Sequence, residues 1–236
     1  MTEILTYRDK RLALDFIPPT RAGRGIALSL HGGGLSTRAS TNYLADCFTD
    51  RGIGWASFDC SGWGDSAGER SECSLADRCD DALIVLRHLG LPIDFLIGTS
   101  MGGYGALKLL EQANARNLVL FCPAAYVRDA WSLRFGHGFT DAIRRPQSYL
   151  DSDAGALCAA YTGNVLYVAA EHDAVIPKEV DAMYRSSFRQ ARRVDSLLLR
   201  DCPHPIHRWA IETPERVEHI RSALSAFIDA DLANSD

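Results

Sequence analysis

The chain has 236 residues and a formal net charge of −5, and 47% of its residues are hydrophobic. This size and composition are typical of a single globular domain over residues 1–236, and the acidic balance favours neither a nucleic acid nor an anionic membrane as a partner. No apolar run is long enough to span a membrane, and the N-terminus lacks the apolar core of a secretory signal. The seven cysteines include no Cys-x-x-Cys pair, so we expect no disulfide framework and no metal site, and a cytoplasmic protein.

The first quarter of the chain predicts strands that alternate with helices. Three strands are expected, at Arg11–Ile17, Gly25–Leu30 and Gly54–Asp59. The first alternates in polarity and stops at Pro18-Pro19, which is typical of an edge strand, whereas the other two are continuous apolar runs typical of strands covered on both faces. A helix is expected at about 41–50, and a longer one follows the N-cap residue Ser74 and ends at Gly90.

The central feature of the sequence is Gly98-x-Ser100-x-Gly102, between an apolar run at Ile93–Leu96 and a helix-favouring segment at 106–113. A strand that reverses into a helix within about three residues forces the central residue into a strained backbone conformation. Glycines on both sides have no Cβ to collide with the adjoining strand and helix. The pattern predicts that the hydroxyl of Ser100 is exposed to a substrate and a base.

The rest of the chain continues the alternation. Further strands are expected at 117–121, 164–169 and 194–199, with helices at 178–189 and from Thr213-Pro214 onward. Alternating strands and helices predict an α/β fold with a mostly parallel central sheet flanked by helices. The interval of about 126–163 is too long for a plain loop, and we expect it to form a small helical lid.

A serine hydroxyl needs a base that is itself oriented by an acid. Sites in parallel sheets form at the carboxyl ends of the strands, so the partners should follow later strands. Asp173 follows one such strand and is the candidate acid. Two histidines follow the last strand, and we favour His204, between two prolines, over His207 as the base.

The oxyanion formed during acyl transfer needs hydrogen-bond donors. One is the backbone N–H of Met101, directly after the serine. The other is expected from the glycine loop after the strand at 25–30, with Gly33 as first choice and Gly34 as second. No Lys-Ser/Thr or Gly-x-Gly-x-x-Gly pattern accompanies this loop, which argues against phosphate binding.

The glycine loop, serine turn, acid and histidine occur in an order that resembles the α/β-hydrolase superfamily, over about Gly25 to Asp229. The resemblance is carried by five segments, 31–34, 59–66, 98–103, 171–177 and 202–204. The chain is similar to the small, minimally capped members, which are the serine esterases, the dienelactone-hydrolase relatives and the acyl-peptide-cleaving relatives. The resemblance implies Ser100 as nucleophile, Asp173 as orienting acid, His204 as base and His31 as a structural brace of the oxyanion loop.

We therefore expect a serine hydrolase that cleaves a carboxylic ester or thioester of a small to medium acyl substrate through an acyl-enzyme on Ser100. No cofactor is expected, and a small acyl compound is the expected partner. Gly34, Trp63 and Trp131 are candidate substrate-binding residues. The same triad would serve an acyltransferase or a lactone-forming cyclase, and a non-catalytic binding protein on the same fold is a third alternative. The oligomeric state stays open, with a dimer as one option.

Overall fold

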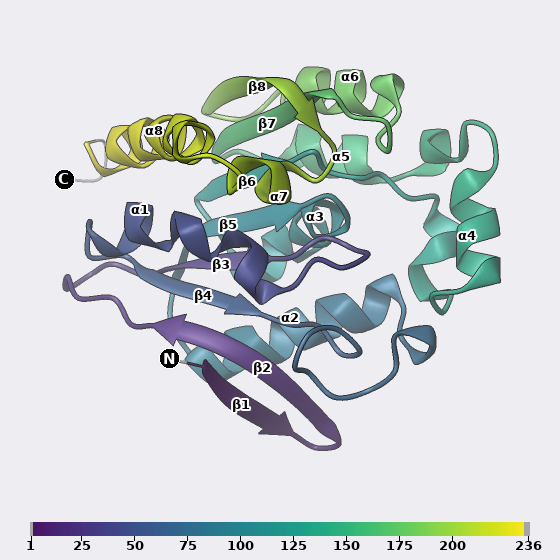
Figure 1. Cartoon of the computed structure of the whole chain (residues 1–236), viewed down its shortest axis with the longest axis horizontal. Coiled ribbons are helices and arrows are strands. Elements are labelled where there is room, and N and C mark those ends of the chain that lie inside the picture. Colours follow the sequence, from purple (N-terminus) through teal and green to yellow (C-terminus); the bar gives the residue numbers. More distant parts are fainter. Residues whose placement is uncertain (1, 234–236) are drawn as a thin grey trace.

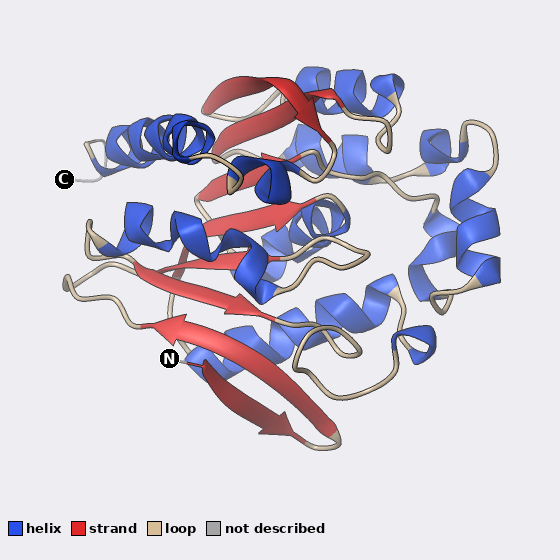
Figure 2. Cartoon of the chain, in the orientation of Figure 1, coloured by secondary structure: helices blue, strands red, loops and turns tan. Residues whose placement is uncertain are grey.

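Eight strands form one twisted sheet in a computed structural model that describes residues 2–233 (Figures 1 and 2). The strands are β1 (Thr2–Tyr7), β2 (Lys10–Ile17), β3 (Ile26–Leu30), β4 (Gly54–Phe58), β5 (Ile93–Thr99), β6 (Asn117–Phe121), β7 (Asn164–His172) and β8 (Arg193–Pro203). Their order is β1-β2-β4-β3-β5-β6-β7-β8. Pairing is antiparallel as far as β4 and parallel from β4 to β8, which confirms the predicted fold class.

Helices cover both faces of the sheet. They are η1 (Arg38–Leu44), α1 (Ala45–Thr49), η2 (Arg70–Glu72), α2 (Leu75–Leu89), α3 (Met101–Ala113), η3 (Arg128–Ser132), α4 (His137–Arg144), η4 (Ser148–Asp151), α5 (Ala154–Ala160), α6 (Lys178–Ser187), α7 (Ile206–Ala210) and α8 (Pro214–Leu232), where η marks a 3-10 helix. Apolar side chains of α1, α7 and α8 pack on one face, the near one in Figure 1. Those of α2, α3, α5 and α6 pack on the other face. The parallel strands are therefore buried on both sides, as their continuous apolar sequences indicated.

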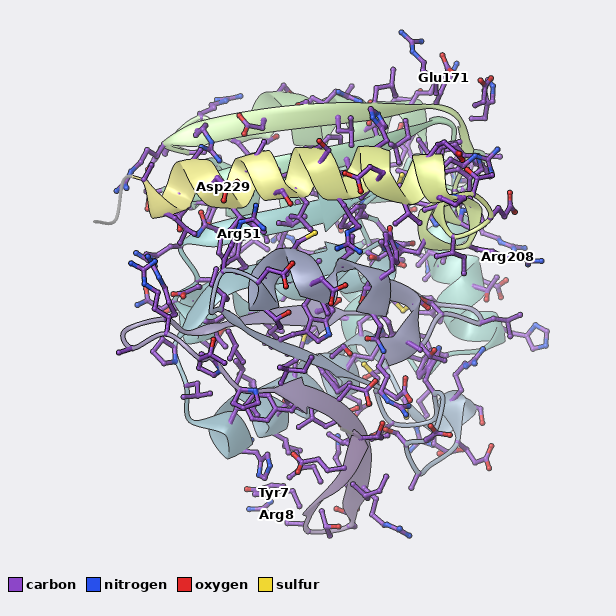
Figure 3. All side chains as sticks on the ribbon, turned by 60° about the vertical axis from the view of Figure 1, so that its left-hand side comes forward. Tyr7, Arg8, Arg51, Glu171, Arg208 and Asp229 are labelled. Carbon is purple, nitrogen blue, oxygen red and sulfur yellow. The ribbon has the colours of Figure 1, made fainter. Side chains whose placement is uncertain are left out.

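The prediction that 11–17 forms an edge strand is wrong. β2 lies between β4 and β1, and β1 occupies the edge. A tight turn at Arg8, whose φ is 55°, joins β1 to β2 at the bottom of Figure 3. Most side chains of β1 are exposed, so its sequence carries little of the burial pattern that marks a strand.

Two predicted helices differ in how well the sequence defined them. Ser74 caps α2 as expected: its hydroxyl accepts a hydrogen bond from the Asp77 amide, and the Asp77 carboxylate accepts one from the Ser74 amide. The helix predicted at 41–50 instead begins earlier as η1 and continues as α1. Arg51, in the turn after α1, forms two hydrogen bonds with Asp229 and so ties this segment to α8 (Figure 3).

The interval expected to form a lid contains η3, α4, η4 and α5. α5 packs in the layer with α3 and α6, because a crossover between the parallel strands β6 and β7 must cover the sheet face. α4 lies apart from that layer, on the side toward which the parallel strands point (Figure 1). The part that could act as a lid is therefore η3 to η4.

All seven cysteines are free and buried. Within residues 2–233, no helix has the length and apolar character needed to cross a membrane.

Candidate active site

Ser100 occupies the sharp turn between β5 and α3. Its φ of 51° and ψ of −113° lie in a region that non-glycine residues rarely adopt. The next strand and the loop after it hold this conformation. The Ser100 amide donates to the carbonyl oxygen of Phe121 at 2.8 Å, and the Ser100 carbonyl accepts from the amide of Ala124 at 3.0 Å.

The glycines beside Ser100 are required by close backbone contacts. A Cβ on Gly98 would lie 2.5 Å from the carbonyl oxygen of Gly102, and a Cβ on Gly102 would lie 2.3 Å from that of Leu30. Both distances are far below van der Waals contact. The Gly-x-Ser-x-Gly pattern therefore allows β3, β5 and α3 to approach one another at this turn.

Ser100, His204 and Asp173 are linked by hydrogen bonds, although they come from three separate parts of the chain. His204 Nε2 lies 3.0 Å from Ser100 Oγ, and His204 Nδ1 lies 2.7 Å from Asp173 Oδ2. Each residue follows the carboxyl end of its strand, β5, β8 and β7 respectively, which brings them to one edge of the sheet. The structure thus joins the three residues that the sequence singled out.

Asp173 is held in a tight turn that fixes its carboxylate. Its Oδ1 accepts hydrogen bonds from the amides of Val175 at 2.8 Å and Ile176 at 2.9 Å, which leaves Oδ2 for His204. Partial burial acts to raise the pKa of Asp173, but the hydrogen bonds from His204 and the two amides outweigh it and lower the pKa below its ordinary value. The carboxylate is therefore ionised at neutral pH.

The alternative base, His207, does not contact Ser100. It is buried in α7, where its ring nitrogens lie 2.9 Å from the Tyr43 hydroxyl and 2.7 Å from that of Thr99. Burial lowers the pKa of His207 to about 3, so the ring is neutral. His207 connects η1 to the end of β5.

The loop that follows β3 lies against the serine turn. A Cβ on Gly33 would meet the Met101 side chain at 3.2 Å, so the two predicted oxyanion donors are neighbours. Met101 is the first residue of α3, where amides have no acceptor within the helix. Among the described residues, the amide of Gly33 likewise finds no acceptor. Both amides are thus without a hydrogen-bond partner among the described residues, which leaves them available as donors.

His31 braces this loop from inside. Its Nε2 accepts a hydrogen bond from the Cys60 amide at 3.1 Å, so Nδ1 carries the proton and donates to the carbonyl oxygen of Gly32 at 2.7 Å. Burial and the nearby charge of Arg78 lower the pKa of His31 well below its ordinary value. His31 is a neutral structural residue.

The two tryptophans among the candidate substrate-binding residues pack against other parts of the protein. Trp63 is buried, donates from Nε1 to the carbonyl oxygen of Gly34 at 3.2 Å, and packs edge-on against Phe135 at 5.3 Å. Trp131 packs against Tyr104 at 6.2 Å. Substrate contact by Gly34, Trp63 and Trp131 stays a prediction.

Neither of two cavities in the described chain is lined by Ser100 or His204. One, of about 320 Å³, adjoins Asp173 on the side of α6, and the other, of about 560 Å³, lies at Phe135 and Gly136.

Two groups of side chains in residues 2–233 bring potential metal ligands within 4.8 Å of one another. The exposed group is Glu171, His172 and Asp201. The other is Cys122 with Asp173 and His204, and there the carboxylate and imidazole already bond to each other. Burial and the charge of Asp173 raise the pKa of the Cys122 thiol, which keeps it protonated and disfavours a metal at this position.

Three residues at the site were missed from the sequence: Cys122, Tyr43 and Arg78. Cys122 and Tyr43 offered no local signal, because their neighbours Asp173 and His207 are distant in the chain. Arg78 did offer a local signal, because it is a charged residue between Leu75 and Ala82 on the apolar face of α2.

Comparisons with known proteins agree with the observed fold. A search of curated protein sequences finds no significant match. Solved structures share the fold at low sequence identity. Among them are alpha/beta hydrolase domain-containing protein 10 from mouse (17% identity, 98% of this chain and 99% of the other covered, TM-score 0.71), an esterase from Exiguobacterium antarcticum (18%, 95% and 99%, 0.67) and Est1E from Butyrivibrio proteoclasticus with bound ferulic acid (15%, 98% and 99%, 0.71).

The family model described as serine aminopeptidase, S33, matches residues 22–151, more than half of the chain. That range contains the glycine loop and the Ser100 turn, while Asp173 and His204 lie beyond it. The chain therefore belongs to this family of α/β-hydrolases.

Proposed function

We propose that the protein is a serine hydrolase that cleaves a carboxylic ester or thioester of a small to medium acyl group through an acyl-enzyme on Ser100. The observation that carries this proposal is the continuous hydrogen-bond chain from Asp173 through His204 to Ser100 Oγ. A base oriented by an acid and in contact with a strained, partly exposed serine is the arrangement that activates a hydroxyl for attack.

In the proposed mechanism, proton transfer follows from the imidazole tautomer. The ionised Asp173 accepts a hydrogen bond from Nδ1–H of His204, which leaves the lone pair of Nε2 directed at the serine hydroxyl. As Oγ attacks the acyl carbonyl, Nε2 accepts the hydroxyl proton and then donates it to the leaving alcohol or thiol. Asp173 stabilises the imidazolium that forms between these steps.

The oxyanion of the tetrahedral intermediate is bound by the amides of Gly33 and Met101. Loss of one such donor typically raises the activation barrier by about 3 kcal/mol, because its hydrogen bond to the developing oxyanion is stronger than its hydrogen bond to the neutral carbonyl of the substrate. A water molecule activated by His204 then attacks the acyl-enzyme, and the acid is released by the same steps in reverse order. Side chains, backbone amides and water supply every step.

The proposed partner is a small acyl compound. The name of the matching family model also raises peptide cleavage, for which the same triad would have to protonate an amine leaving group. We favour the ester or thioester because these leaving groups need less assistance.

Covalent labelling tests the nucleophile directly. A fluorophosphonate probe should label the wild-type protein under native conditions and fail to label Ser100→Ala, which removes only Oγ. Absence of labelling in folded wild-type protein would refute the proposal.

Product analysis tests the substrate class. We expect p-nitrophenyl acetate and butyrate to be hydrolysed by the wild-type protein and not by Ser100→Ala. An aminoacyl p-nitroanilide should be cleaved far more slowly than either ester. Comparable cleavage of the anilide would identify a peptidase instead.

A further inference from the structure

A buried arginine lies behind the glycine loop. Arg78 of α2 is only 5% exposed, and its Nη2 donates to the carbonyl oxygens of His31 at 2.5 Å and Gly32 at 3.3 Å. The guanidinium also lies 4.7 Å from the centre of the Trp63 ring. The side chain therefore contacts the loop that carries the proposed oxyanion donor Gly33, from the side away from solvent.

This arginine has no ion-pair partner among residues 2–233. The two buried carboxylates of the region are occupied elsewhere, since Asp59 pairs with Arg38 and Asp81 with Lys10. One nitrogen, Nη1, is buried without any hydrogen-bond partner. A buried, uncompensated charge is costly to folding, so stability alone does not explain Arg78.

The geometry of one peptide group connects Arg78 to the oxyanion site. The carbonyl oxygen of Gly32 accepts from both Arg78 Nη2 and His31 Nδ1. Because a trans peptide is planar, its N–H points opposite to its C=O. The N–H of this same peptide belongs to Gly33. The hydrogen bonds from Arg78 and His31 to the carbonyl group therefore direct the Gly33 N–H away from the interior and polarise it.

We propose that Arg78 is a positioning residue of the oxyanion hole. It fixes the Gly32–Gly33 peptide and places a full positive charge one peptide behind the developing oxyanion, in a region where burial leaves the charge weakly screened. The inference rests on the proposed function. Since a neutral ester carries no such charge, Arg78 should stabilise the transition state and leave substrate binding nearly unchanged.

Two variants of Arg78 separate charge from packing. Arg78→Met keeps much of the apolar stem and removes the charge and both donors, whereas Arg78→Lys keeps the charge and one donor. The matched control is Arg70→Met. Arg70 lies 4.6 Å from the Trp63 ring but is exposed and donates no hydrogen bond to the glycine loop.

We would measure kcat and KM for p-nitrophenyl butyrate, with the concentration of active sites determined by fluorophosphonate titration. We would also measure Ki for a trifluoromethyl ketone of matching chain length, because this inhibitor forms an anionic tetrahedral adduct. For Arg78→Met, we expect kcat to fall about 10- to 100-fold, below the loss for removing a direct donor. Ki should rise by a similar factor, with KM within about threefold of wild type. Arg78→Lys should recover most of the loss, and Arg70→Met should stay within about twofold of wild type.

If Arg78 had a purely structural role, Arg78→Met would have a lower melting temperature or a smaller fraction of sites labelled by fluorophosphonate, with kcat per labelled site and Ki unchanged. That result would overturn the inference. Equal impairment of Arg78→Lys and Arg78→Met would also overturn it, because the charge would then have no effect. Failure of the wild-type protein to label or to hydrolyse esters would refute the proposed function and this inference together. Normal wild-type activity with normal kcat in Arg78→Met would refute this inference alone.

Discussion

The ring of His207 lies 2.7 Å from the hydroxyl of Thr99, the residue directly before Ser100. The other ring nitrogen contacts Tyr43 at 2.9 Å, and the ring packs against Phe121 at 4.7 Å. His207 therefore holds the end of β5 in place, while His204, three residues earlier, reaches Ser100 itself. Two histidines only three residues apart thus differ in their contacts: His204 bonds to the serine, and His207 in α7 supports the strand before it.

The first prediction concerns these two histidines. His204→Ala should lower kcat by about 10³-fold or more, because Ser100 loses the base that accepts its proton. His207→Gln should keep kcat within about fivefold and lower the free energy of unfolding by about 1–3 kcal/mol, since buried groups of Tyr43 and Thr99 lose a partner. Steady-state kinetics and urea unfolding of both variants measure this. The reverse pattern would assign the base to His207.

The second prediction concerns the acid. Asp173→Asn should lower kcat by about 10³–10⁴-fold at pH 7, because the amide can hold the imidazole in the wrong tautomer. Asp201→Asn is the control: Asp201 is exposed near the carboxyl end of β8, and its carboxylate lies 3.7 Å from the exposed His172. This variant should retain full activity. Equal losses in the two variants would contradict the assignment of Asp173.

The serine turn could be predicted from the sequence because its causes are local. Gly98, Ser100 and Gly102 lie within five consecutive residues, and the strand before them and the helix after them have clear patterns. The choice of acid and base could be narrowed to a few residues, including Asp173 and His204, only because parallel strands bring their carboxyl ends to one edge of the sheet. The choice between His204 and His207 needed coordinates, since both follow β8 within a few residues.

The parts that the sequence did not predict depend on distant partners. The edge strand β1 was missed because only Leu5 of its six residues is buried, and what defines it is its pairing with β2. Arg78 occupies the apolar face of α2, but a long cationic side chain at such a position can also extend to solvent along the helix. The carbonyl groups that keep it buried belong to a loop more than 40 residues earlier in the chain.

The third prediction concerns the glycines of α3. Gly102→Ala should destabilise the fold by about 3 kcal/mol or more, because the added Cβ would lie 2.3 Å from the Leu30 carbonyl oxygen and backbone would have to move. Gly105→Ala is the matched change, one turn later in the same helix. Its Cβ would have an ordinary contact of 3.5 Å, so it should stabilise the protein by about 0.5–1 kcal/mol. Thermal melts of both variants test this, and similar melting temperatures would contradict it.

The fourth prediction concerns acid stability and the two buried histidines. Burial lowers the pKa of His207 to about 3, and burial together with Arg78 lowers the pKa of His31 well below 6.5. In the unfolded chain both titrate near their ordinary value of about 6.5. Between that pH and about 3, the unfolded state binds protons that the native state does not, so the free energy of unfolding is fully retained above about pH 6.5 and falls as the pH drops.

Each of the two histidines should contribute up to about 1.4 kcal/mol per pH unit to this slope. Urea unfolding at several pH values from 4.5 to 7 measures it. His207→Gln should lower stability at pH 7 and flatten the slope by about one proton, because glutamine does not titrate and, of the two histidines, only His31 continues to contribute. The two curves should therefore converge toward low pH. If the plots of unfolding free energy against pH were parallel for the two proteins, His207 would take up no proton on unfolding in this range. The burial of its neutral ring would then not destabilise the protein in acid.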